Sequence, residues 1–213
     1  MPERGRFLTF EGGEGAGKST QIARLAASLR QKGLSILTTR EPGGSPGAES
    51  IRTLLVTGTT GRWDAISEAL LNFAARRDHL VTTIWPALQR GEWVLCDRFA
   101  DSTVAYQGYG GKMSISAIRR LYTVAVGDFA PDITLVLDVP VLVGLGRAIE
   151  RGGGEDRYEQ MDRDFHERLR MGFLAIARRE PKRCVVIDGT ASADDVQVAI
   201  LDAVLSRLGT GTA

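Results

Sequence analysis

The chain has 213 residues, a length that favours one domain with a sizeable core. Charged residues make up 25% of it and the formal net charge is +1, which argues against a nucleic-acid-binding surface and against a disordered charged tail. The apolar stretch near the N-terminus is too short for a signal peptide or a membrane helix, and we expect Cys96 and Cys184 to be buried, reduced thiols. We therefore predict a single cytoplasmic domain, residues 1–213, that binds neither nucleic acid nor a membrane.

Five short apolar runs are predicted strands, at residues 6–10, 34–39, 93–97, 133–139 and 184–188. Helical spacing of apolar residues predicts helices at 19–32, 68–90, 116–128, 141–150, 160–179 and 194–208. Continuously apolar strands that alternate with helices indicate a parallel sheet covered on both faces. Ligands of such sheets bind at the carboxyl ends of the strands, so the segments that follow each strand are the candidates for a site.

The first strand is followed by Gly12-x4-Gly17-Lys18-Ser19, the pattern of a Walker A phosphate loop. Its backbone N–H groups cradle phosphate oxygens, Lys18 reaches the β- and γ-phosphates, and the Ser19 hydroxyl binds Mg²⁺. The pattern needs a strand before it and a helix after it, and both are predicted here. The loop alone does not explain Glu14, an acid placed inside an anion-binding segment.

Two strands end in a carboxylate that could hold Mg²⁺, Asp97 and Asp138. We favour Asp97, because Arg98 follows it and a guanidinium suits a phosphate group. Val139-Pro140 follows Asp138 and leads into a helix. A helix cap or a structural ion pair is the alternative for either acid.

Two groups of arginines indicate further phosphate chemistry. Arg40 ends the second strand and, together with Arg98, could clamp a second phosphate group; the alternative is a solvated surface charge. A protein that only binds a nucleoside triphosphate does not need this clamp, whereas a kinase with a phosphate acceptor does. Around Gly152–Gly154 stand Arg147, Arg151 and Arg157, a pattern that suits an arginine-bearing lid at about 147–160, or else a flexible loop.

These segments together resemble bacterial thymidylate kinases. The resemblance rests, in order, on FEGGEGAGKST, TREPGG, FAARRDHL, CDRFADSTVAYQG, PDITLVLD and RGGGEDRYEQ, and it covers nearly the whole chain. Many NTPases share the phosphate loop, whereas REPGG together with DRF and AYQG is far more specific. The resemblance implies an α/β P-loop NTPase three-layer sandwich with a five-stranded parallel sheet, a homodimer, and Mg²⁺-dependent transfer of the ATP γ-phosphate to dTMP, giving dTDP.

Position by position, the resemblance implies a set of site residues. Glu14 matches the loop acid near the sugar 3′-OH and the metal. The implied catalytic residues are Lys18, Glu14, Arg98 and Arg151, and the implied Mg²⁺ ligands, partly through water, are Ser19, Asp97 and Glu14. The ATP side comprises Gly12, Gly13, Glu14, Gly15, Ala16, Gly17, Lys18, Ser19, Thr20, Arg147 and Asp188. The dTMP side comprises Glu14, Arg40, Arg52, Phe73, Arg76, Arg98, Thr103, Tyr106 and Gln107.

The chain departs from the family pattern on the acceptor helix. The family usually has an aromatic residue four positions before the arginine of Arg-x-x-His, where this chain has Asn72. Either Phe73 stacks on thymine and Arg76 reads the base edge, or the helix is shifted and Arg77 does so; we favour Phe73 with Arg76.

A further departure lies in the phosphate loop. Some members carry an arginine just after the loop acid, where this chain has Gly15. We therefore expect Arg151 to supply that charge from the lid, and Arg157 to hold the lid closed through neighbouring acids.

Two other functions compete with the implied one. Another nucleotide or nucleoside kinase of the same fold is the first, although Arg40 beside Arg98 argues against an acceptor without a phosphate. A non-catalytic nucleotide switch or a DNA-linked ATPase is the second. The sequence lacks an Asn-Lys-x-Asp guanine-binding motif, and its near-neutral charge does not support a basic stripe.

Overall fold

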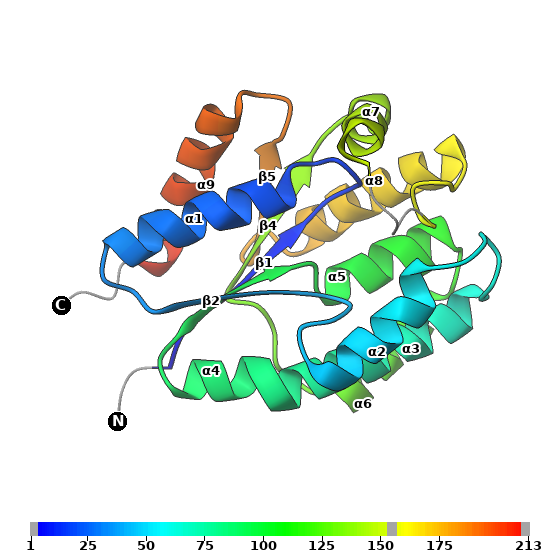
Figure 1. The fold of residues 1–213 in the computed structure, drawn as a ribbon, viewed down its shortest axis with the longest axis horizontal. Coiled ribbons are helices and arrows are strands. Elements are labelled where there is room, and N and C mark those ends of the chain that lie inside the picture. Colours follow the sequence, from blue (N-terminus) through cyan, green and yellow to red (C-terminus); the bar gives the residue numbers. More distant parts are fainter. Residues whose placement is uncertain (1–3, 153–156, 210–213) are drawn as a thin grey trace.

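The structure, a computed structural model, describes residues 4–152 and 157–209, and its centre is one parallel sheet (Figure 1). The strands are β1 (Phe7–Glu11), β2 (Ile36–Arg40), β3 (Trp93–Asp97), β4 (Ile133–Asp138) and β5 (Cys184–Asp188). They pair in the order β2-β3-β1-β4-β5, all parallel. The predicted five-stranded parallel sheet is confirmed, and each predicted strand end lies within two residues of the observed one.

Helices connect the strands in the described parts of the chain. They are α1 (Lys18–Gln31), α2 (Pro46–Val56), α3 (Ala65–His79), α4 (Trp85–Gln89), α5 (Ala100–Thr103), α6 (Ile115–Ala125), α7 (Val141–Arg151), α8 (Arg163–Arg179) and α9 (Ala193–Leu208), with π-helical segments η1 (Leu80–Ile84) and η2 (Val104–Gly110). The predicted helix 68–90 is α3, η1 and α4 in continuous succession. It starts earlier than predicted, because Asp64 caps it by accepting a hydrogen bond from the Ser67 N–H. Neither α2 nor the α5–η2 segment was predicted, since both contain glycines that suggest loops.

The helices cover both faces of the sheet and make a three-layer sandwich (Figure 1). On one face, α1 and α9 bury the apolar stripe that their spacing predicts, including Leu25, Leu29 and Ile200. On the other face, α3, η1, α4 and α6 pack over Phe7, and η2 packs against α8. Each fully buried Leu or Phe side chain contributes about 1.5–3 kcal/mol relative to an exposed one, so these layers hold the sheet in place.

The carboxyl ends of all five strands meet at one edge of the sheet, because the strands are parallel. Their last residues are Glu11, Arg40, Asp97, Asp138 and Asp188. The strand register pairs Arg40 with Asp97 and Asp138 with Asp188. Charged side chains from distant parts of the sequence are thereby gathered at the edge where ligands of such folds bind.

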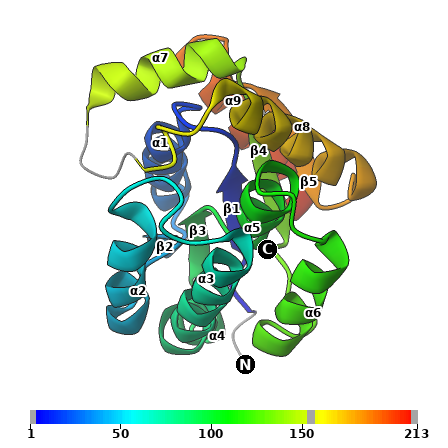
Figure 2. The same cartoon turned by 90° about the vertical axis from the view of Figure 1, so that its right-hand side faces the viewer.

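The segment predicted as a lid begins as regular helix, because α7 continues to Arg151. Figure 2 shows α7 apart from the adjacent pair α2 and α3. Residues 153–156 of the predicted lid lie outside the described residues. Cys96 and Cys184 are both free and buried, as predicted. None of the described helices has the length and apolar character needed to cross a membrane.

Candidate active site

The phosphate loop joins β1 to α1 and packs closely on the backbone of neighbouring segments. A Cβ on Gly15 would lie 1.9 Å from the carbonyl oxygen of Gly144, and one on Gly12 would lie 2.4 Å from that of Leu137. Both glycines also have positive φ, at 63° and 137°. Only glycine fits these positions, so contact with β4 and α7 holds the loop in its shape.

Lys18 opens α1 and folds back over the loop. Its Nζ donates to the carbonyl oxygens of Gly13 at 2.9 Å and Gly12 at 3.3 Å. Burial lowers the pKa of the Lys18 ammonium, and the nearby Arg98 guanidinium lowers it further. The first turn of α1 contains no acid, so the positive end of its dipole and the lysine are both suited to attract an anion to the loop.

Ser19 and Asp97 place two oxygen ligands side by side. The Ser19 Oγ donates to Asp97 Oδ2 at 2.9 Å. Mg²⁺ is commonly held by one or two carboxylates together with substrate phosphates, and this pair fits that pattern. Within residues 4–152 and 157–209, no three His, Cys, Asp or Glu side chains cluster to hold a metal by themselves. Asp138 instead forms a two-pronged ion pair with Arg170, at 2.7 and 2.9 Å, which is the structural alternative named for it.

Glu14 and Arg98 form the centre of the site. The Arg98 guanidinium donates to Glu14 Oε1 at 3.0 Å and to the Gly12 carbonyl oxygen at 2.9 Å, and the Tyr106 hydroxyl donates to the same Oε1. Burial opposes the ionisation of Glu14, but Arg98 and Lys18 outweigh it and lower the pKa of Glu14 to about 2. The acid is therefore a carboxylate at neutral pH, and it orients a guanidinium toward the loop.

Glu11, the last residue of β1, bonds the segment that follows Arg98. Its carboxyl oxygens accept hydrogen bonds from the Phe99 N–H at 2.8 Å and from the Ser102 hydroxyl at 2.6 Å. These bonds hold the turn in which Arg98 takes a left-handed backbone conformation, with φ 69°. Burial, and secondarily the Asp101 charge, raises the pKa of Glu11 to about 8.

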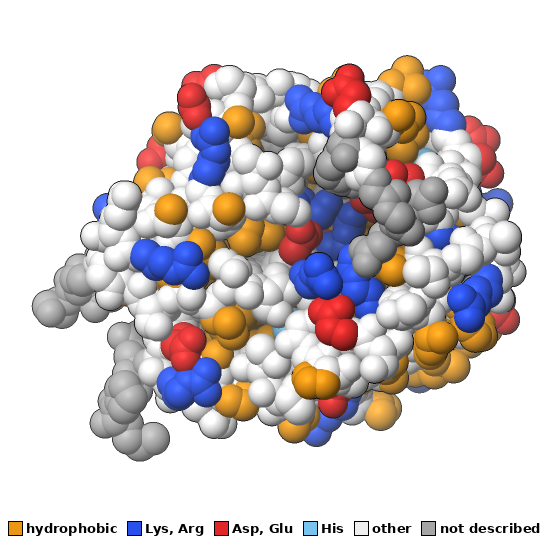
Figure 3. Space-filling view, in the orientation of Figure 1, with side chains coloured by type: hydrophobic (Ala, Val, Ile, Leu, Met, Phe, Trp, Pro, Cys, Tyr) orange, Lys and Arg blue, Asp and Glu red, His pale blue; other side chains and the backbone are white. Residues whose placement is uncertain are grey.

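A cleft of about 630 Å³ runs from the phosphate loop to α2 and α3. Lys and Arg side chains gather in a hollow on the face of the molecule drawn in Figure 3. The predicted residues that line the cleft are Glu14, Gly15, Ala16, Gly17, Lys18, Ser19, Thr20, Arg40, Arg52, Arg76, Asp97, Arg98, Thr103, Tyr106 and Gln107. Residues assigned to two different ligands thus share one space.

Two further guanidinium groups line the cleft, one from β2 and one from α2. Arg40 is half-exposed and pairs with Glu49 at 3.2 Å. Arg52 donates to the Pro42 carbonyl oxygen at 2.7 Å. Together with Arg98 they bring three guanidinium groups to the cleft lining.

Arg76 also lines the cleft and is almost completely buried. It donates to Glu41 at 2.7 Å, to the Thr103 hydroxyl at 3.1 Å and to the Phe99 carbonyl oxygen at 3.0 Å. The other oxygen of Glu41 contacts His79 Nδ1 at 3.1 Å. Sequence reasoning did not identify Glu41 as the partner that holds this arginine.

The prediction that Phe73 stacks on a ligand is corrected by the geometry. Phe73 is buried, and the Arg76 guanidinium lies over its ring at 4.9 Å. Asn72 lines the cleft in its place. Arg77 instead packs over Trp85, so Arg76 is the arginine that faces the cleft.

The residues assigned to the far end of ATP lie outside this cleft. Arg147 donates to the Gly189 carbonyl oxygen at 3.0 Å, while the Asp188 carboxylate accepts from Thr190. This loop lies beside the phosphate loop, since a Cβ on Gly189 would be 3.5 Å from the Ala16 carbonyl oxygen.

Of the two arginines predicted to act from the lid, Arg157 has a described side chain and Arg151 does not. The backbone of Arg151 ends α7, and its side chain lies outside the described residues. Arg157 is buried, donates to the Leu55 carbonyl oxygen at 2.6 Å and pairs with Glu68. Its partner is therefore an acid of α3 and not a sequence neighbour.

Glu68 and Asn72 were not predicted as site residues, although a signal for them exists. Together with Arg76 they recur every four residues along α3, which places them on one face of the helix. Searching for polar residues at this spacing before Arg76 would have found both.

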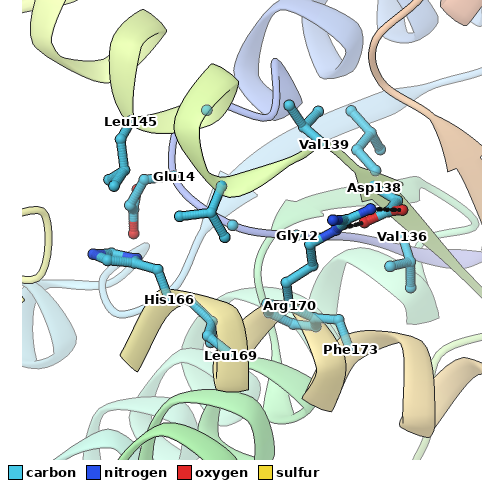
Figure 4. A pocket seen from close by; sticks show the side chains of 14 residues that line it. Gly12, Glu14, Val136, Asp138, Val139, Leu145, His166, Leu169, Arg170 and Phe173 are labelled. Atoms are coloured by element: carbon cyan, nitrogen blue, oxygen red, sulfur yellow. Dashed lines mark hydrogen bonds and ion pairs between the residues drawn. The ribbon is translucent and has the colours of Figure 1, made fainter. Parts of the chain in front are cut away.

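A small cavity of about 20 Å³ lies behind the phosphate loop (Figure 4). His166 of α8 and Glu14 point toward one another at its edge, and the Asp138–Arg170 ion pair lies at its other side. Burial lowers the pKa of His166. Its position opposite the loop acid was not predicted.

Comparison with known proteins agrees with this geometry. The family described as "Thymidylate kinase" matches residues 10–200. A thymidylate kinase of Caulobacter vibrioides is 58% identical over 97% of this chain and 99% of its own length, and one of a Bradyrhizobium species is 54% identical over 100% and 95%. A crystal structure of thymidylate kinase from Ehrlichia chaffeensis superimposes with a TM-score of 0.77 at 36% identity, covering 94% of this chain and 98% of the other. The chain belongs to the thymidylate kinase family.

Proposed function

We propose that this protein transfers the γ-phosphoryl group of ATP to the phosphate of dTMP, giving dTDP. The observation that carries the proposal is the single cleft that Lys18 of the phosphate loop shares with Arg40, Arg52 and Arg98. Two sets of cationic groups in one space suit a reaction that joins two phosphorylated substrates.

The chain's own groups account for the binding and alignment of both substrates. Lys18 and the N-terminus of α1 would hold the β- and γ-phosphates, and Ser19 and Asp97 would hold Mg²⁺. The ion, when bound, neutralises charge on the transferring group. Arg98, oriented by Glu14, would hold the acceptor phosphate in line. A phosphate monoester is already largely ionised at pH 7, so the acceptor oxygen needs no general base.

Arg151 is the residue proposed to stabilise the remaining negative charge on the phosphoryl group as it is transferred. Gly15 occupies the loop position that carries an arginine in some members, so the lid is the expected source. Tyr106, whose ring lies under Arg98 at 4.9 Å, would crowd a ribose 2′-OH and favour the deoxy sugar. Arg147 and Asp188 remain the proposed adenine-side residues.

We also propose a homodimer in the cytoplasm. Large apolar side chains are exposed on helices that pack side by side, with Leu54 on α2, Ile66 and Leu70 on α3, and Val124 on α6. Such a patch suits a protein interface. Leu70→Glu should convert the dimer to a monomer in light-scattering measurements. The two free, buried cysteines suit a reducing compartment.

A coupled assay over a panel of nucleosides and nucleoside monophosphates tests the proposed reaction. We expect ADP formation with dTMP and none with thymidine. Turnover of thymidine in preference to dTMP would support the competing nucleoside kinase and contradict the assignment of Arg40 and Arg98 to an acceptor phosphate.

A further inference from the structure

Four side chains between α3, η2 and the segment before α8 share one buried network, which we call the Glu68 cluster: Glu68, Gln107, Arg157 and Tyr158. Glu68 Oε1 accepts from Arg157. Glu68 Oε2 accepts from the Gln107 amide at 2.8 Å and from the Tyr158 hydroxyl at 3.2 Å. Glu68, Gln107 and Arg157 are almost completely buried.

The chemistry of this cluster determines how the Gln107 amide is oriented. A carboxylate beside a guanidinium only accepts hydrogen bonds, so the amide atom that faces Glu68 is the NH₂ group. The Tyr158 hydroxyl oxygen lies on the same side of the amide nitrogen, 3.5 Å from it. With its NH₂ group turned to Glu68, Gln107 has the carbonyl oxygen as the acceptor it can offer to the cleft, which Gln107 lines.

We propose that Glu68 is a specificity-determining residue that acts by positioning Gln107, and this rests on the proposed phosphorylation of dTMP. A fixed carbonyl oxygen accepts from the N3–H group of a thymine or uracil ring. Arg76 also lines the cleft, and its guanidinium has more N–H donors than its contacts with Glu41, Thr103 and Phe99 use. Arg76 can therefore donate a hydrogen bond to the ring carbonyl oxygen next to N3. Cytosine presents a lone pair at N3 and an amino group at C4, so both contacts would be repulsive.

The substitution Glu68→Gln tests this with little change in shape. The new carbonyl oxygen stays with Arg157, so the new NH₂ group faces Gln107. Gln107 must then turn its carbonyl inward and its NH₂ group toward the cleft. We expect the ratio of kcat/KM for dTMP to that for dCMP to fall at least about tenfold, mainly through KM, because hydrogen-bond complementarity to the ring edge is reversed. The ratio of dTMP to dUMP should stay within about twofold, since the two bases share this edge.

Arg157→Lys is the matched control, because it changes the same cluster but leaves Glu68 bonded to Gln107. We expect it to retain the wild-type dTMP to dCMP ratio even where kcat falls. If Glu68→Gln does not fold, Glu68→Asp keeps the charge, shortens the reach to the amide, and should lower the same ratio.

Several outcomes would overturn the proposal. An unchanged dTMP to dCMP ratio in a folded Glu68 variant would do so. An equal loss against dUMP would show a general loosening of the site, and an equal fall in Arg157→Lys would place the effect in the lid segment. Wild-type protein that turns over dCMP in preference to dTMP would refute the proposed function itself and this inference with it.

Discussion

Replacing Arg76 by methionine should destabilise the protein strongly, although the arginine belongs to a ligand cleft. The guanidinium is 2% exposed and bonds Glu41, Thr103 and the Phe99 carbonyl oxygen. Methionine keeps much of the volume but leaves the Glu41 carboxylate, 3% exposed, without its cationic partner. Breaking a buried pair in this way costs about 3–5 kcal/mol. For a chain of this length that is a fall in Tm of about 6–20 °C.

Guanidinium chloride unfolding of Arg76→Met and of Arg40→Met measures this cost against a matched arginine. Arg40 is 53% exposed and, among the described residues, pairs with a half-exposed Glu49, so its loss should change the free energy of unfolding by less than about 0.5 kcal/mol. The double variant Arg76→Met/Glu41→Gln should recover part of the loss, because it removes the unpaired charge. A loss below about 1 kcal/mol in Arg76→Met, or a double variant no more stable than the single one, would refute the assignment of Glu41 and Arg76 as a mutually dependent buried pair.

Three further substitutions test the phosphate end of the cleft and its support. Lys18→Ala should abolish turnover while the unfolding curve stays near that of wild type, because the ammonium neutralises the charge of the bound phosphates. Near-normal activity in a folded variant would contradict the phosphate-loop assignment. Arg98→Ala should weaken dTMP binding by about 2–3 kcal/mol and ATP binding far less, as measured by calorimetry with each nucleotide. A larger loss of ATP binding than of dTMP binding would show that the two sites have been assigned the wrong way round. The pKa of Glu11 is raised by burial and by Asp101 from 4.5 to about 8, so the stability due to its protonated form is full below pH 4.5 and is lost as the pH rises to 8. Glu11→Gln should therefore flatten the fall in unfolding free energy between pH 5 and pH 8, and an unchanged slope would contradict the raised pKa.

Local patterns in the sequence were sufficient to predict the sheet and the phosphate loop. Apolar runs predicted all five strands, because a strand buried on both faces has no alternative to apolar side chains. The loop could be predicted because its glycines and Lys18 act through backbone geometry within one short segment. The choice of Asp97 over Asp138 as a metal ligand stays a prediction, although Asp97 accepts a hydrogen bond from Ser19 and Asp138 is paired with Arg170.

The cleft lining around Arg76 and Gln107 could not be predicted from local patterns, because it depends on contacts between distant parts of the chain. Glu41 and Arg76 are 35 residues apart, and Glu68 meets Gln107 and Arg157 from 39 and 89 residues away. No local pattern encodes such pairs, because the packing of α3 against η2 and the sheet brings them together.

Phe73 shows the same limit within a single helix. Helical periodicity states which residues share a face, but the rotation of α3 about its axis is set by the layers on which it packs. That rotation buries Phe73 beneath Arg76 and turns Asn72 to the cleft. The sequence alone thus determined the residue types proposed for the phosphate chemistry, while only the tertiary structure decided which side chains face the cleft, because that choice follows from the packing of one element against another.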